Sequence, residues 1–159
     1  MKNLTRSIAA LILALVLSAS SAGCGEGSPP DLTPFIGTWT VAAAAITVLC
    51  DDNSVKAVSV SDPTVMVMGT DSDLIDDDPT CPVLYNVSGG VAHALPGQTC
   101  NNPEVITLMH LLNGTFTPGK GAMATHNASG KLDGYINITL GETVFCTFNE
   151  MGVYRRGGN

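Results

Sequence analysis

Short runs of β-branched residues, separated by Gly, Asn, Asp and Pro, follow one another from Phe35 to the end of the chain. Val, Ile and Thr favour extended strands, and no long stretch shows the 3.6-residue period of an amphipathic helix. We therefore expect an all-β domain, with a turn at 127–131 among its connections. The pattern predicts strands over residues 36–50, 55–60, 64–68, 83–87, 91–95, 105–117, 122–126, 135–140 and 143–154.

Residues 105–112 leave an alternative open, because 102–104 could cap a helix and 113–114 could end it. The β-branched residues at 105–107 and the continuation at 114–117 suit a sheet better. We expect a strand here and keep the helix as the alternative.

Eight or nine sequential antiparallel strands are more than a strongly twisted open sheet holds comfortably, and closure removes edges that promote aggregation. The economical architecture is a small antiparallel up-and-down β-barrel, in which the first strand pairs with the last. Pairing Cys50 with Cys146 and Trp39 with Arg155 gives nearly the same register. A bulge near Ala45 would keep the apolar residues of the first strand on one face.

The chain contains five cysteines, and four of them, an even set, lie within the predicted barrel. In an oxidising compartment such a set predicts two disulfides, although four cysteines permit three pairings. The strand order favours Cys50 with Cys146, which would join the first and last strands, and Cys81 with Cys100, which flank a predicted hairpin. In the chain-entropy model the shorter loop contributes about 3 kcal/mol and the longer one about 4.7 kcal/mol.

The N-terminal stretch has the order of an export signal. Lys2 and Arg6 precede the apolar run 8–17, and only small residues follow at 18–23. Ten apolar residues are too few to cross a hydrocarbon core as a helix, which needs about 20. We therefore expect residues 1–23 to be a cleaved signal peptide.

The residues Ser21-Ala22-Gly23-Cys24 resemble a bacterial lipobox, whose cysteine receives a diacylglyceryl group and a further acyl chain such as palmitate. The resemblance implies a lipoprotein anchored through Cys24, because two or three chains hold a protein on a membrane where one does not. Secretion after ordinary signal cleavage is the alternative. The expected location is the cell envelope, on the inner or outer membrane, facing the periplasm or the cell surface.

Composition predicts the organisation of the remaining chain and excludes some partners. Residues 24–34 are rich in Gly, Ser and Pro and predict a flexible linker to a barrel domain at 35–159. Without the signal peptide, five basic residues remain against fourteen acidic ones, a net charge of about −9. Because such a surface repels nucleic acid and anionic lipid, we expect no nucleic-acid partner and membrane contact only through the N-terminal lipid.

Five aspartates in one short segment are a weak candidate for a calcium site, because carboxylate oxygens are the ligands that Ca²⁺ prefers. They are Asp71, Asp73, Asp76, Asp77 and Asp78. Their spacing is not that of an EF-hand, so a solvated acidic loop is the simpler interpretation.

Other catalytic and metal-binding patterns are weaker still. His93, His110 and His126 could supply nitrogens to zinc, but they fall on separate predicted strands without a close pair. The chain has no G-x-S-x-G nucleophile elbow, and Gly119 and Gly121 lie in a predicted turn without the ending of a phosphate-binding loop. We expect a protein that is not an enzyme and carries no cofactor.

At 35–40 the sequence Phe-Ile-Gly-Thr-Trp-Thr resembles the G-x-W opening of the lipocalin and calycin superfamily. In that superfamily the tryptophan lies at the barrel floor and packs against a basic residue beyond the last strand. The resemblance implies that Trp39 closes the barrel together with Arg155 or Arg156 through a cation–π contact. A core aromatic without that role is the simpler interpretation of Trp39.

More of the chain is similar to a group of uncharacterised lipoproteins from myxobacteria and relatives, in which a lipobox and short linker precede a Gly-Thr-Trp-Thr strand. The matching features cover most of 35–156 and include 69–74, the hairpin after Cys81, 96–100 and 144–148. The group has no established activity, so the resemblance implies the fold and the location and says nothing of chemistry.

Two functions agree with this location and fold. The first is an envelope lipoprotein whose disulfide-bonded barrel is an interaction or structural module for an envelope partner. The second is a lipocalin-like carrier that holds a small apolar ligand among Val, Ala, Met and Leu side chains. The interior volume distinguishes them, because close packing favours the module and a cavity favours the carrier.

Overall fold

The computed structural model describes residues 28–60, 62–102, 106–137 and 142–157. These residues form ten strands and no helix, so the predicted all-β class is confirmed. The strands are β1 (Gly37–Cys50), β2 (Val55–Ser59), β3 (Thr64–Met68), β4 (Leu74–Asp76), β5 (Val83–Ser88), β6 (Val91–Ala94), β7 (Thr99–Asn102), β8 (Ile106–Pro118), β9 (Met123–Asn137) and β10 (Glu142–Arg156).

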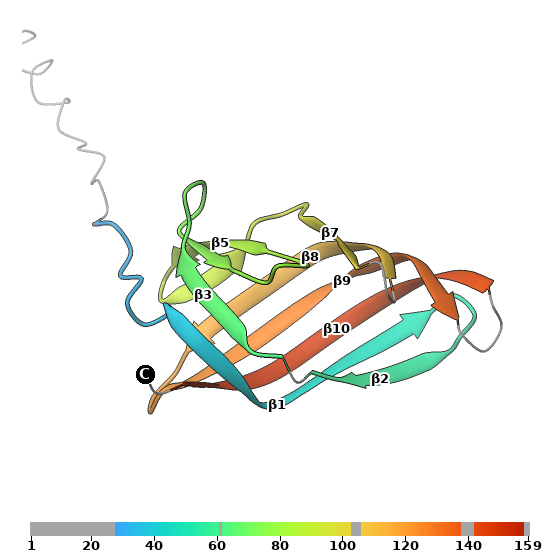
Figure 1. The fold of residues 1–159 in the computed structure, drawn as a ribbon, viewed down its shortest axis with the longest axis horizontal. Helices are drawn as coiled ribbons and strands as arrows, with labels where there is room; N and C mark the ends of the chain where they lie inside the picture. Colours follow the sequence, from blue (N-terminus) through green and yellow to red (C-terminus); the bar gives the residue numbers. More distant parts are fainter. Residues whose placement is uncertain (1–27, 61, 103–105, 138–141, 158–159) are drawn as a thin grey trace, which may run out of the picture.

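The strands close into an antiparallel barrel, as predicted. Eight of them are hydrogen-bonded in the order β10-β9-β8-β6-β5-β4-β3-β1, and β1 also pairs with β10. In Figure 1 the long strands β8, β9, β10 and β1 lie side by side, and β2 extends this wall beyond β1. The architecture is compatible with a lipocalin-like fold.

The two remaining strands, β2 and β7, pair with the parts of β1 and β8 that β3 and β6 leave uncovered. The first residues of β1 pair with β3 and its last residues pair with β2, so β2 and β3 are two parts of one interrupted strand. Strands β6 and β7 share β8 in the same way. Pro63 lies in the first interruption and Pro96 in the second. Proline has no N–H to donate to a ladder, so both breaks have a local cause.

Pairing of β1 with β10 closes the barrel along most of its height. Cys50 pairs with Cys146, as the sequence predicts, but Trp39 pairs with Arg156. The predicted pairing of Trp39 with Arg155 is therefore wrong by one residue.

One extra residue in β1, Ala42, shifts the register between Val41 and Ala43 and brings Arg156 opposite Trp39, whereas the predicted pair would have required two extra residues. The shift lies within a run of four alanines, where no large side chain fixes the alternation, so the bulge predicted near Ala45 is slightly misplaced. Its effect is the predicted one, since Trp39 on one side of it and Val48 on the other are both buried.

The turn predicted at 127–131 is wrong, because β9 runs through these residues without interruption. Polar and small residues alternate along this stretch, which is the pattern of a strand with one face inward. The outward residues are Asn127, Ser129 and Lys131, and the inward residues are Ala128, Gly130 and Leu132. Glycine suits position 130, because a Cβ there would collide with the His110 carbonyl and the Phe148 ring. The strand preferred for 105–112 is confirmed by β8 from Ile106 onward, and residue 105 lies outside the described residues.

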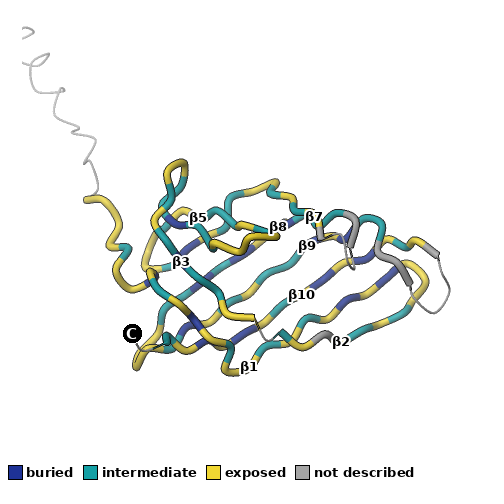
Figure 2. Tube along the Cα trace, viewed as in Figure 1, coloured by how far each residue is buried: buried dark blue, intermediate teal, exposed yellow. Residues whose placement is uncertain are grey.

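Two apolar clusters lie inside the barrel, and we call the one around Trp39 the lower cluster and the one beside the Cys50–Cys146 disulfide the upper cluster. Figure 2 shows buried residues alternating with more exposed ones along the long strands. The lower cluster contains Phe35, Trp39, Met66, Leu74, Tyr85, Ala92, Phe116, Ala124 and Tyr154. The upper cluster contains Val48, Cys50, Leu111, Leu132, Cys146 and Phe148.

Trp39 seals the lower end of the barrel. Its indole N–H donates to the Phe35 carbonyl at 2.7 Å, and the Arg156 guanidinium carbon lies 4.7 Å from its ring centroid. The same guanidinium donates to the carbonyls of Thr33 and Pro34. Of the two C-terminal arginines, Arg156 therefore takes the place beside the tryptophan and also holds the segment that enters β1.

Both predicted disulfides are confirmed. Cys50–Cys146 joins β1 to β10 at the last pair of their ladder, and Cys81–Cys100 joins the connection before β5 to β7. Two structural disulfides are consistent with an extracytoplasmic location. The described residues include no helix of the length and apolarity needed to cross a membrane.

Candidate functional site

A cavity of about 400 Å³ lies inside the barrel, next to the upper apolar cluster. This volume falls within the range of small-molecule sites in proteins, about 300 to 1,000 Å³. Its walls are mostly apolar and come from both sides of the barrel. The main apolar lining residues are Ile46, Val48, Met109, Leu111, Leu132 and Phe148.

The cavity opens where the barrel wall is interrupted. Asp62 and Pro63, between β2 and β3, and Asp78 and Thr80, between β4 and β5, line it and are all exposed. The mouth therefore lies between two loops that have left the β-ladder, and it carries two carboxylates.

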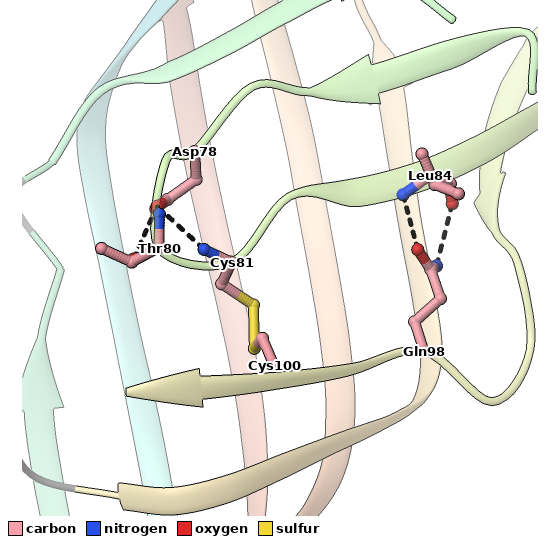
Figure 3. The surroundings of a disulfide bond; sticks show 6 residues. All are labelled: Asp78, Thr80, Cys81, Leu84, Gln98 and Cys100. Carbon is pink, nitrogen blue, oxygen red and sulfur yellow. Dashed lines mark hydrogen bonds between the residues drawn. A yellow bond between two sulfur atoms is a disulfide. The ribbon is translucent and has the colours of Figure 1, made fainter. Parts of the chain in front are cut away.

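The loop between β4 and β5 is held in a fixed shape (Figure 3). Asp78 Oδ1 accepts hydrogen bonds from the N–H and the hydroxyl of Thr80, both at 2.7 Å, and from the Cys81 N–H at 3.2 Å. The Thr80 hydroxyl contributes most to lowering the pKa of Asp78, ahead of the backbone donors. The Cys81–Cys100 disulfide then ties the loop to β7, so one side of the mouth is rigid.

Gln98 holds β5, the strand that follows this loop, through hydrogen bonds to the backbone of Leu84 (Figure 3). Its side-chain oxygen accepts from the Leu84 N–H at 2.7 Å, and its nitrogen donates to the Leu84 carbonyl at 3.0 Å and the Leu95 carbonyl at 2.9 Å. The primary amide thus continues the ladder of β5 where β6 ends. The sequence shows only the Pro-Gly turn before Gln98, which does not predict this role.

A cluster of polar side chains forms the lower part of the cavity, between the two apolar clusters. His126 Nδ1 lies 3.1 Å from Glu150 Oε1, and the Tyr154 hydroxyl donates to the same oxygen at 3.2 Å. The side chains of His126 and Glu150 are each only 14% exposed. Burial alone would raise the pKa of Glu150, but the hydrogen bond and charge of His126 together with the Tyr154 hydroxyl outweigh burial and lower it.

Asp76, at the end of β4, is the second carboxylate in the cavity wall. It accepts a hydrogen bond from the Val65 N–H, but its buried Oδ1 has no partner among the described residues. Burial raises the pKa of Asp76 to about 7, and the charge of His126 opposes part of that rise. A carboxyl group with a strongly raised pKa in a cavity is typical of functional sites.

The acidic segment is not gathered around a single point. Asp73 accepts from the Val87 N–H at 2.6 Å, Asp78 caps the loop at the mouth, Asp76 faces the cavity, and Asp71 is exposed. No group of three or more His, Cys, Asp and Glu side chains within the described ranges is placed to hold a metal ion. Nothing in this arrangement supports the weak calcium candidate that includes Asp71, Asp73 and Asp76.

The three histidines lie apart as well. His93 is exposed on β6, His110 Nε2 lies 2.8 Å from Asp133 Oδ2 on partly exposed side chains, and only His126 enters the cavity. The predicted lipidation site, Cys24, lies outside the described residues.

Sequence reasoning missed Glu150 and Tyr154 as cavity residues, although β10 contains a signal for them. Its inward positions alternate with outward ones and are otherwise apolar or small. They are Cys146, Phe148, Glu150, Gly152 and Tyr154. A single charged residue at inward spacing indicates a polar group inside the barrel.

No family model, curated protein or solved structure matches the chain.

The free energy of unfolding should report the burial of Asp76. In the unfolded chain Asp76 ionises near pH 3.8, whereas in the folded barrel its pKa is about 7. The folded state therefore holds more protons than the unfolded state between these values, and Asp76 lowers stability as pH rises toward 7. We expect Asp76→Asn to stabilise the protein by about 1 to 3 kcal/mol at pH 8 and by less at pH 5.

Denaturant unfolding of the wild type and the variant at pH 5, 6, 7 and 8 measures this difference. Asp71→Asn removes an exposed carboxylate from the same segment and is the matched control, which should show no such trend. A stabilisation by Asp76→Asn that does not grow between pH 5 and pH 7 would contradict the assignment.

Proposed function

We propose that the protein binds a small, largely apolar molecule inside its barrel, as a lipocalin-like carrier. The observation that carries the proposal is the cavity of about 400 Å³, whose apolar walls meet a cluster of polar groups. Small-molecule sites combine these two features, because apolar walls supply binding free energy and a few polar groups fix orientation.

Strand pairing, a disulfide and a side-chain hydrogen bond fix the walls around the cavity. Closure between β1 and β10 fixes one wall, and the Cys81–Cys100 disulfide with Gln98 fixes the wall beside the mouth. A preformed site binds more tightly than one that must be ordered by its ligand, because less conformational entropy is lost. The rigid mouth therefore favours binding over a purely structural role for the interior.

We propose binding without catalysis. The described residues that line the cavity include no serine and no lysine, and Cys81 among them is in a disulfide. Burial and the charge of Glu150 raise the pKa of the Tyr154 hydroxyl, which disfavours a nucleophilic phenolate.

A surface patch favours a second function, that of an interaction module. Leu49 and Val55 pair across β1 and β2, and Phe145 lies at the same end of the barrel beside Asp51. Their side chains are 51%, 64% and 59% exposed, respectively. Large apolar side chains gathered at one exposed site are typical of surfaces that contact a partner.

We further propose that the protein is a bacterial envelope lipoprotein, tethered through Cys24 by residues 24–34. The lipobox-like sequence and the two disulfides support this proposal. The carrier would then work close to a membrane, which is a source of apolar molecules.

Filling the cavity with a larger side chain should weaken the binding of an apolar molecule. Ala128 faces the cavity from β9, so Ala128→Phe would occupy the space that a ligand needs. We expect the affinity for N-phenyl-1-naphthylamine, an apolar dye that fluoresces in apolar surroundings, to fall by about tenfold or more. Asn127→Phe adds the same ring to the outer face of the same strand and should leave dye binding unchanged. Equal binding to both variants would place the dye outside the barrel.

Anchoring is tested by intact-mass analysis of the protein extracted from the membranes of an exporting bacterium. We expect a chain that begins at Cys24 and carries acyl chains, with a gain of four hydrogen atoms when two disulfides are reduced. A soluble chain with an unmodified N-terminus would rule out the lipid anchor.

A further inference from the structure

One carboxylate oxygen in the cavity wall has no protein group to bind. Asp76 Oδ1 is buried and accepts no hydrogen bond within the part of the chain that the structure describes. Buried polar atoms in folded proteins are nearly always hydrogen-bonded, and leaving one unpaired is costly. Because Asp76 lines a cavity of small-molecule size and is only partly buried as a residue, its incompletely paired carboxylate indicates a ligand group that donates a hydrogen bond.

The other inner carboxylate of the cavity is already engaged. Glu150 Oε1 lies 3.1 Å from His126 Nδ1 and accepts from the Tyr154 hydroxyl at 3.2 Å, so its charge is compensated without a ligand. Asp62 and Asp78 also line the cavity, but they stand exposed at its mouth. Asp76 is therefore the inner carboxylate that remains for a bound molecule.

The surrounding charge selects the kind of donor. No lysine or arginine is among the described residues that line the cavity, and its one histidine, His126, is paired with Glu150 at 3.1 Å. Asp78 and Asp62 stand exposed at the mouth, so carboxylates outnumber the basic group. A cleft lined by charge of one sign concentrates ions of the opposite sign and disfavours ions of its own. The potential at Asp76 therefore favours a cationic group over a neutral one and disfavours an anionic head group.

The rest of the cavity suits an apolar body attached to that cation. Leu111, Leu132 and Phe148 form part of one wall, and the aromatic rings of Tyr85 and Tyr154 lie on the side of the polar cluster. Aromatic rings also stabilise cations that approach their faces. The apolar walls would contact the body of such an amine, and Asp76 with the aromatic rings would contact its ammonium group.

We propose that the ligand of this cavity is a small amine with an apolar body, whose ammonium group donates a hydrogen bond to the Asp76 carboxylate. The assignment rests on the proposed carrier function and adds the chemical class of the ligand. It makes Asp76 the residue that determines head-group specificity, while the apolar walls bind the body.

Competition among three matched ligands tests this assignment. Decylamine, 1-decanol and decanoate share a ten-carbon chain and differ in head group, and each is titrated against bound N-phenyl-1-naphthylamine on the full-length protein from an exporting host. The assay is run at pH 8, where Asp76, with a pKa of about 7, is mostly ionised and the amine is cationic. We expect decylamine to compete about tenfold better than decanol, and decanoate to compete least well.

Asp76→Asn should remove most of the preference for decylamine over decanol and leave decanol binding within about twofold, since the amide keeps the shape of the side chain but not its charge. Asp76→Leu should do the same, and binding of the dye to either variant shows that the cavity is intact. The control Asp71→Asn removes an exposed charge from the same segment and should preserve the preference.

Equal competition by the three ligands, or a preference for the amine that survives both Asp76 variants, would overturn the head-group assignment and leave the carrier function standing. Failure of the dye and all three ligands to bind the wild type would overturn both.

Discussion

The pairing of β1 with β10 is the interaction on which the rest of the structure depends. It converts a meander with two free edges into a closed barrel and encloses the space in which all later features lie. Cys50–Cys146 pins one end of this ladder, and Trp39 stacked with Arg156 seals the other. Between them a single bulge at Ala42 lets both halves of β1 face inward.

Closure alone does not give a tightly packed interior. The lower aromatic cluster fills one end of the barrel, but above it a polar cluster and a cavity take the place of a continuous apolar core. Burial raises the pKa of Asp76, so the ionised carboxylate is expected to lower stability at neutral pH. Apolar side chains at positions 76 and 150 would avoid this cost, and the polar groups found there are the ones to which we assign ligand binding.

The sequence predicted those parts of the fold that follow from local pattern and chain topology. Alternation of β-branched residues indicated the long strands, and the positions of four cysteines along the strand order indicated both disulfides. Where composition was ambiguous the prediction was less accurate. A stretch of Asn, Ser, Gly and Lys at 127–131 suggested a turn although it alternates as a strand, and four alanines hid the position of the bulge. The carrier alternative allowed for a cavity inside the barrel, but the sequence did not indicate that Asp76 and Glu150 line the same cavity, because they come together only through tertiary closure.

A crystal structure of the protein, isolated from the bacterium that makes it, tests the central claim most directly. That claim is that a closed barrel encloses a ligand site between its aromatic floor and its upper apolar cluster. We expect electron density for an apolar molecule beside Leu111 and Phe148, with a polar atom within about 3 Å of the Asp76 carboxylate. An interior in which these side chains have closed the cavity and Asp76 is paired with a protein group would contradict it.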